Sequence, residues 1–231
     1  LFFRPVLAAA LLLLVQSAYL IARPAQLWGL CGFCMAAAAA VTDLLLRRRD
    51  RLPLLLAVGV FLAMTNSVNL TDGLDGLAAK VTAVYLVFFG AVVFFAAGTL
   101  AGTAAEEYRN LTVMAAALFG ALFGFICYNG YPARIFMGDT GSLSLGGALA
   151  ALAVMTRLEF IVPIIGVMYA VSSLSVMLQV TYFKLTHGKR LFKMSPLHHH
   201  FELLGYTETR IVSVYMIITV LLCLVCLLAY L

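Results

Sequence analysis

Long apolar runs, separated by short polar stretches, make up most of the 231-residue chain. These runs lack the regular alternation of apolar and polar positions that marks an amphipathic helix or a half-buried strand. Because about 20 apolar residues are needed to cross the hydrocarbon core of a bilayer, we expect each run to form a membrane-spanning helix. The predicted spans cover residues 5–22, 52–70, 81–99, 110–128, 142–157, 160–183 and 211–230.

One further run, residues 26–46, is long enough to cross a membrane but contains Asp43 and an alanine-rich centre. The pattern therefore predicts an all-α, polytopic helical bundle with seven spans, or eight if this run also crosses. No internal repeat and no flexible linker divides the chain. We accordingly expect residues 1–231 to form a single transmembrane domain.

Composition supports a bilayer location. The chain is 64% hydrophobic and 11% charged, with a mean hydropathy of +1.06, whereas soluble domains are about half apolar and about a quarter charged. The net charge of +5 is weak evidence for an anionic partner, because basic residues in membrane proteins often only set orientation. We expect no nucleic-acid partner. The cysteines lie mostly in apolar runs without histidine neighbours, which indicates packing rather than metal binding.

Three polar segments interrupt the apolar pattern, at residues 69–80, 129–141 and 184–210. Two spans separate each segment from the next, so the chain crosses and returns between them. All three segments should therefore meet on one side of the membrane, whatever the N-terminal third does. Basic residues are divided almost evenly between the two sides, so the positive-inside rule does not identify that side.

The first segment contains two carboxylates next to a span boundary. Asp72 and Asp75 are three residues apart and would share one face of a helix. Two like charges repel unless a cation or a hydrogen-bonding ligand lies between them. Gly73 and Gly76 could let such a ligand approach the backbone. The alternative interpretation is a polar loop that only caps a helix.

The second segment ends with Asp139 among small residues, in Gly-Asp-Thr-Gly-Ser, at the start of a span. A helix N-terminus offers unpaired N–H groups and the positive end of the helix dipole, which suit a phosphate. Magnesium is typically held by one or two carboxylates together with substrate phosphates. A simple N-terminal capping aspartate is the alternative.

The third segment contains three consecutive histidines, His198, His199 and His200, within Ser-Pro-Leu-His-His-His-Phe-Glu. Consecutive residues of a helix point about 100° apart, so the three rings cannot all bind one metal. One or two of them could instead donate to a phosphate or carry a proton. Zinc has little support here, and a solvated histidine-rich loop remains the alternative.

Together, these segments suit transfer of a phosphorylated group to a lipid. Their sequences, "NSVNLTDGLDGLA", "YNGYPARIFMGDTGSLSLGG" and "KMSPLHHHFELLG", resemble the bacterial phospho-N-acetylmuramoyl-pentapeptide transferases, a family of polyprenyl-phosphate N-acetylhexosamine-1-phosphate transferases. The resemblance implies transfer of phospho-MurNAc-pentapeptide from UDP-MurNAc-pentapeptide to undecaprenyl phosphate, giving lipid I and UMP in peptidoglycan synthesis. It also implies Mg²⁺, a homodimer, and a multi-pass protein of the bacterial plasma (inner) membrane with its active site on the cytoplasmic face.

The resemblance also implies individual roles. Asp139 would be the magnesium ligand and a catalytic residue, with Asp72 and His199 as the other catalytic residues. Phe136 would stack on uracil. The full set of implied substrate-binding residues is Asn69, Gly73, Asp75, Asn129, Phe136, Ser142, Gln179, His198 and His200.

The chain departs from the family pattern in its N-terminal third. The family carries an adjacent aspartate pair in an N-terminal portion, and no such pair occurs in these residues. We therefore expect the chain to correspond to the C-terminal part of a ten-span fold, and residues 23–51 do not match the family's short outer hairpin. A sister transferase using UDP-GlcNAc, and an inactive fragment, scaffold or transporter, remain alternatives. One-step and two-step transfer are both open.

Overall fold

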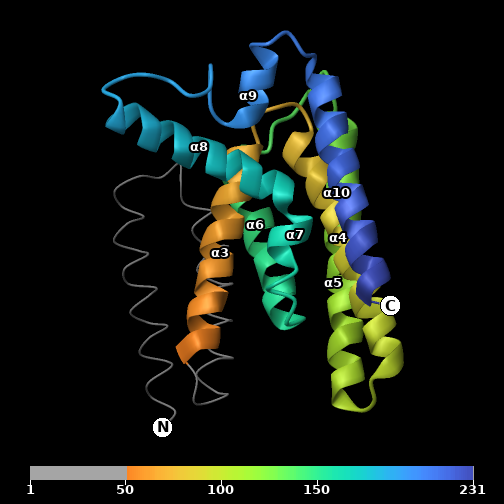
Figure 1. Cartoon of the computed structure of the whole chain (residues 1–231). Coiled ribbons are helices and arrows are strands. Elements are labelled where there is room, and N and C mark those ends of the chain that lie inside the picture. Colours follow the sequence, from red (N-terminus) through yellow and green to blue (C-terminus); the bar gives the residue numbers. More distant parts are fainter. Residues whose placement is uncertain (1–50, 231) are drawn as a thin grey trace, which may run out of the picture.

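The computed structural model describes residues 51–230, with side chains from residue 56 onward, and in this range every regular element is a helix. The predicted span 5–22 and the run 26–46 lie outside the described residues. The helices are α3 (Arg51–Thr71), α4 (Leu77–Thr99), α5 (Thr103–Asn129), α6 (Gly138–Met155), α7 (Val162–Ile165), α8 (Val167–Leu185), α9 (Leu197–Glu202) and α10 (Glu208–Tyr230), arranged as in Figure 1.

Helix α4 forms the core of one half of the bundle. It packs between α5 and α10 (Figure 1), and most of its length is buried, including the large side chains of Tyr85 and Phe89. Helix α10, in contrast, exposes many apolar side chains such as Ile217, Leu224 and Leu228. An apolar side chain on the outside of a bundle is stable against lipid rather than water.

Helices α3 and α6 pack very closely. A methyl group built on Gly146 would lie only 2.6 Å from the Cα atom of Thr65 and 2.7 Å from the carbonyl oxygen of Met64. Glycine therefore lets the two backbones touch, as small residues commonly do between membrane helices. This contact aligns the C-terminal end of α3 with the N-terminal end of α6.

The membrane assignment and the all-helical fold are confirmed for the described residues. Helices α4, α5 and α10 are long and apolar enough to cross a bilayer, and Leu56–Thr71 within α3 is a shorter apolar helix.

The prediction of one continuous helix over residues 160–183 is wrong. The segment is divided at Gly166 into the short helix α7 and the longer helix α8. A side chain at Gly166 would lie 2.7 Å from the carbonyl oxygen of Val162 and 3.1 Å from the hydroxyl of Tyr85, so the chain can turn there only without one. As a result, α8 crosses the end of α3 instead of running beside it (Figure 1).

Candidate active site

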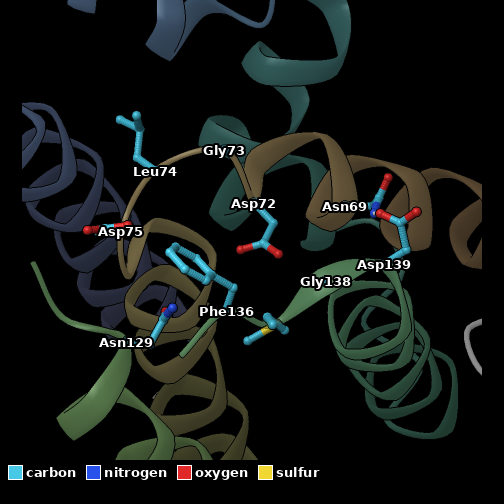
Figure 2. A pocket seen from close by; sticks show the side chains of 10 residues that line it. Asn69, Asp72, Gly73, Leu74, Asp75, Asn129, Phe136, Gly138 and Asp139 are labelled. Carbon is cyan, nitrogen blue, oxygen red and sulfur yellow. The ribbon is translucent and has the colours of Figure 1, made fainter. Parts of the chain in front are cut away.

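An open pocket lies where the C-terminal ends of α3 and α5 meet the N-terminal end of α6. Its volume is about 230 Å³, slightly below the range of about 300–1,000 Å³ for complete small-molecule sites. The pocket therefore suits the polar part of a larger ligand. Its lining residues are Asn69, Asp72, Gly73, Leu74, Asp75, Asn129, Phe136, Met137, Gly138 and Asp139 (Figure 2).

The side chain of Asn69 joins α3 to α6 at the edge of this pocket. Its Nδ2 donates to Oδ1 of Asp139 at 3.0 Å and to Oγ of Ser142 at 3.0 Å. Ser142 is fully buried and also donates to the carbonyl oxygen of Gly138. The Asp139 carboxylate is thus oriented through one oxygen, and its other oxygen has no protein partner among the described residues.

The Asp72 carboxylate lies between Phe136 and the Asn69–Asp139 pair (Figure 2). Burial, with a second contribution from the nearby charge of Asp139, raises the pKa of Asp72 from 3.8 to about 6. A buried carboxylate next to a second negative charge, as Asp72 is, would be stabilised by a cation bound between the two.

Asp75 and Asn129 hold the loop that carries Phe136. Asp75 Oδ2 accepts the backbone N–H of Ala133 at 2.8 Å, and Asn129 Nδ2 donates to the carbonyl oxygen of Ile135 at 2.8 Å. Phe136 follows directly, and 76% of it is exposed at the pocket. A rigid loop with an exposed ring offers a stacking face to a planar ligand.

The histidines are carried by the short helix α9, which lies against the loop of Asp72. A Cβ atom on Gly73 would collide with the ring of His198 and would come 3.0 Å from Nε2 of His199. The space beside Gly73 that a side chain would fill is therefore occupied by the imidazole rings of these histidines. All three polar segments meet at one end of the bundle, as the alternation of spans predicted.

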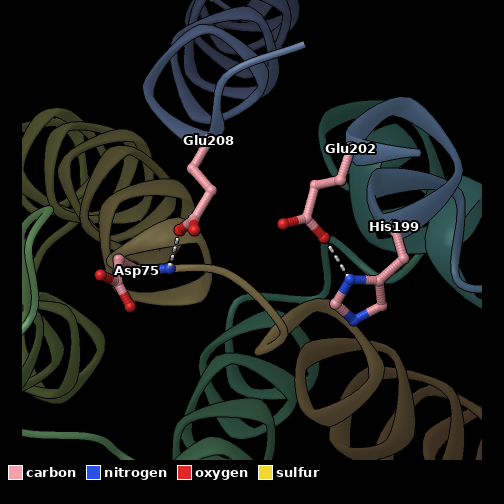
Figure 3. Close-up of polar contacts among 4 residues, drawn as sticks. All are labelled: Asp75, His199, Glu202 and Glu208. Atoms are coloured by element: carbon pink, nitrogen blue, oxygen red, sulfur yellow. Dashed lines mark hydrogen bonds and ion pairs between the residues drawn. The ribbon is translucent and has the colours of Figure 1, made fainter. Parts of the chain in front are cut away.

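The three histidines differ in their surroundings. His198 is fully buried, and neither ring nitrogen has a partner among the described residues. Burial, and then the neighbouring His199, lowers the pKa of His198 to about 3, so this ring is neutral at pH 7. His199 Nδ1 is bonded to Glu202 (Figure 3), and His200 Nδ1 accepts the N–H of Lys193 at 3.1 Å.

Gln179 lies outside the pocket lining and is bonded to the segment that leads into α9. Its Oε1 accepts the N–H groups of Leu191 and Phe192, at 3.0 and 2.8 Å, and its Nε2 donates to the carbonyl oxygen of Phe192. One helical turn earlier, Ser175 Oγ accepts the N–H of Leu197 at 3.0 Å. Helix α8 thus holds both ends of the segment before the histidines.

The residues in the pocket fit a magnesium ion better than a metal held by protein alone. Within residues 51–230, no group of three or more His, Cys, Asp or Glu side chains is placed to hold a metal. Asp139 and Asp72 supply carboxylate oxygens, which magnesium prefers, and it usually completes its shell with water and substrate phosphates.

Two acidic residues that sequence reasoning missed contact this site. The Glu202 carboxylate is paired with the His199 ring. The i, i+3 spacing of the two residues on a helix could have indicated this contact from the sequence. Glu208, the first residue of α10, accepts the backbone N–H of Asp75 at 3.4 Å (Figure 3). Nothing in the sequence indicates this contact, because 133 residues separate the partners.

Comparison with known proteins gives consistent results. The family model "Glycosyl transferase family 4" matches residues 4–157. A Clostridium novyi phospho-N-acetylmuramoyl-pentapeptide-transferase is 56% identical over 165 residues, which cover 71% of this chain and 47% of the relative. The enzymes of the same name from Acetivibrio thermocellus and Clostridium perfringens are 51% and 50% identical over 71% and 72% of this chain, and 47% and 48% of their own length.

The chain spans about half the length of the curated relatives it matches. Those relatives are bacterial, and the apolar helices described above place this chain in a membrane. The match to the family model extends over most of the chain. The chain is therefore a bacterial membrane protein that belongs to glycosyl transferase family 4.

Proposed function

We propose that this chain provides the nucleotide-sugar site of a phospho-N-acetylmuramoyl-pentapeptide transferase. The substrates would be UDP-MurNAc-pentapeptide and undecaprenyl phosphate, and the products lipid I and UMP, at the cytoplasmic face of the plasma membrane. The observation that carries the proposal is one pocket containing an exposed aromatic ring, Phe136, and two carboxylates, Asp72 and Asp139. The names of the relatives support the choice of substrate.

Different residues of the chain would bind different parts of the nucleotide-sugar substrate. Phe136 presents a face on which the uracil ring can stack, and Asp75 and Asn129 keep its loop in place. The first turn of α6 lines the pocket, so a diphosphate bound there would be stabilised by the positive end of the helix dipole. The donor phosphates would therefore lie beside Asp139.

Asp139, with Asp72, would hold Mg²⁺ at this position. A bound magnesium ion would supply positive charge that offsets the charge of the diphosphate during transfer. Asn69 orients the Asp139 carboxylate through Oδ1, and the second oxygen has no protein partner among the described residues. The lipid phosphate is ionised near neutral pH, so the site does not need a strong base. The homodimer stays a prediction.

The test compares the intact chain with Asp139→Asn in detergent. Binding of UDP-MurNAc-pentapeptide is measured by calorimetry with and without Mg²⁺, and transfer to undecaprenyl phosphate is measured separately through the lipid product. We expect magnesium-dependent binding that Asp139→Asn weakens at least about 100-fold, since a charge-assisted contact of this kind is worth about 3 kcal/mol.

Glu107→Gln is the matched control, because this exposed carboxylate lies near the N-terminal end of α5, away from the pocket. Binding that does not depend on magnesium or on Asp139 would contradict the proposal. Tighter binding of UDP-GlcNAc than of UDP-MurNAc-pentapeptide would assign the chain to the sister transferases instead.

A further inference from the structure

The end of α8 and the loop after it, residues 182–194, form a second functional candidate that we call the basic arm. This segment extends away from α4, α5 and α10 (Figure 1), and none of its residues lines the pocket. All of its lysine and arginine side chains are exposed. These cations are Lys184, Lys189, Arg190 and Lys193.

No acidic side chain balances the charge of the basic arm within residues 56–230. No Asp or Glu occurs between Glu159 and Glu202 in the sequence. Among the described side chains, no carboxylate forms an ion pair with an arm cation, since the pair that does form joins His199 to Glu202. Exposed cations that have no counter-ion within the described part of the chain can bind an external anion.

Apolar side chains alternate with these cations and are exposed as well. The exposed fractions are 45% for Phe183, 75% for Leu185 and 49% for Leu191. A soluble anion would make no favourable contact with these apolar side chains. A segment in which exposed aromatic and aliphatic residues alternate with lysine and arginine is typical of the membrane–water interface, where the apolar groups enter the acyl boundary and the cations reach the headgroups.

The backbone keeps both kinds of side chain at one end of α8. The N–H of Gly188 donates to the carbonyl oxygen of Phe183 at 3.0 Å, which closes the helix with a turn through His187 and Gly188 at positive φ. Thr186 Oγ1 donates to the carbonyl oxygen of Tyr182 in the same turn. Lys184 and Lys189 therefore lie on either side of one hydrogen-bonded turn.

We propose that the basic arm binds the anionic phospholipid headgroups of the surrounding bilayer. The proposal goes beyond the transfer reaction and does not depend on it. A lysine or arginine near an anionic membrane surface contributes about fivefold to binding. Lys193 is left out of the test because its Nζ also donates to the carbonyl oxygen of Leu203 beside α9.

The experiment titrates the intact chain in detergent with dioleoyl phosphatidylglycerol or with the zwitterionic phosphatidylcholine, and native mass spectrometry measures the affinity of the first bound lipid. The double variant Lys189→Gln/Arg190→Gln should bind phosphatidylglycerol about 25-fold more weakly, at about fivefold per cation. Its affinity for phosphatidylcholine should not change.

The matched control is Arg109→Gln/Arg157→Gln, which removes the same charge from exposed residues near the start of α5 and after the end of α6, at the other end of the bundle. It should bind phosphatidylglycerol like the wild type. An equal loss in the control would assign the effect to net charge, and an unchanged affinity in the arm variant would remove the basic arm from lipid binding. Either result overturns the proposal.

Two further measurements complete the test, and the first of them uses the wild type alone. Raising ammonium acetate from about 0.05 M to about 0.5 M should weaken phosphatidylglycerol binding to the wild type, because salt screens exposed charges. Undecaprenyl phosphate, titrated alone, separates bulk lipid from the proposed substrate. If only undecaprenyl phosphate depends on Lys189 and Arg190, the arm serves the substrate and the present proposal is wrong.

Discussion

The carboxylate side and the histidine side of the site are held in different ways. On the carboxylate side, long helices α3 and α6 touch backbone to backbone at Gly146, and this contact places Asn69 beside Asp139. On the histidine side, a helix of six residues depends on side-chain hydrogen bonds from α8 to the segment before it. A helix of that length is not stable alone.

This difference predicts different weaknesses. A packed contact between two backbones is sensitive to added volume, because the interior has no free space to give. A segment held by a few polar contacts is sensitive to the loss of a donor or acceptor, because its backbone groups are then left unpaired. Four changes test this distinction.

The largest effect should come from Gly146→Ala. Its methyl group would lie 2.6 Å from the Cα atom of Thr65, so α3 and α6 must separate. Overpacking of this kind costs about 1–3 kcal/mol, and the Asn69–Asp139 hydrogen bond should lengthen with the shift. We expect the midpoint temperature of thermal unfolding to fall. We also expect UDP binding, measured by calorimetry in the presence of magnesium, to weaken about 100-fold.

Gly124→Ala on α5 is the matched control, since a Cβ atom there meets nothing within 4 Å. It should leave both measurements unchanged or raise the thermal midpoint, because alanine favours a helix over glycine. A Gly146→Ala protein with normal stability and normal affinity would show that the close approach of α3 and α6 does not position Asp139.

The next effect should come from Gly73→Ala, where the two sides touch. The new methyl group would collide with the ring of His198, which is fully buried and has little room to move. Either α9 or the loop of Asp72 must shift, and we expect UDP binding to weaken about 30-fold, which corresponds to about 2 kcal/mol.

The double variant Gly73→Ala/His198→Ala is the control that identifies the cause. Removing the ring should restore part of the affinity that Gly73→Ala loses, because the collision is then relieved. If the two losses simply add, the contact between the Asp72 loop and α9 does not connect the two sides.

The long helices were largely predictable from the sequence, for a physical reason. A backbone in lipid must satisfy its own hydrogen bonds, so a long apolar run has helix as its solution, and α3, α4, α5 and α10 formed where such runs occur. The break at Gly166 was missed because the apolar run continues through it, and the close contacts of Gly166 with Val162 and Tyr85 are evident only in the structure.

The partners within the site were much less predictable. Asp72, Asp139 and the histidines stood out because charged and polar groups are rare in this chain. The bond from Asn69 to Asp139 joins residues 70 apart, and Gly73 proved to lie beneath His198 rather than to leave open space. Such pairings depend on how helices pack in three dimensions, and the order of polar residues does not contain that information.

A smaller effect, confined to the histidine side, should follow Gln179→Ala. The change removes the acceptor of two backbone N–H groups, at Leu191 and Phe192, and the donor to one carbonyl. We expect hydrogen exchange of residues 191–202 to become about tenfold faster, since the segment loses about 1–2 kcal/mol of local stability.

Gln179→Glu separates the two roles of the carboxamide. The carboxylate can still accept both N–H groups, but it cannot donate to the carbonyl oxygen of Phe192, so exchange should lie between the wild type and Gln179→Ala. Peptides from α4 serve as the internal control and should not change. A loss of UDP affinity with unchanged exchange would instead indicate that Gln179 contacts the substrate directly.

The smallest effect is a pH dependence that belongs to the carboxylate side alone. Burial and the charge of Asp139 raise the pKa of Asp72 from 3.8 to about 6, so acidification through pH 6 protonates a carboxylate that the proposed magnesium ion would need. We expect magnesium-dependent UDP binding to weaken about fourfold between pH 8 and pH 5.5. Folding responds with the opposite sign. A folded-state pKa above the unfolded value means that the folded protein takes up a proton more readily, so Asp72 favours folding more as the pH falls from about 6 toward 3.8.

Asp72→Asn should bind weakly at every pH and should lose the inflection near pH 6. An inflection that survives in this variant would assign the titration to another group and would leave the two sides indistinguishable by pH.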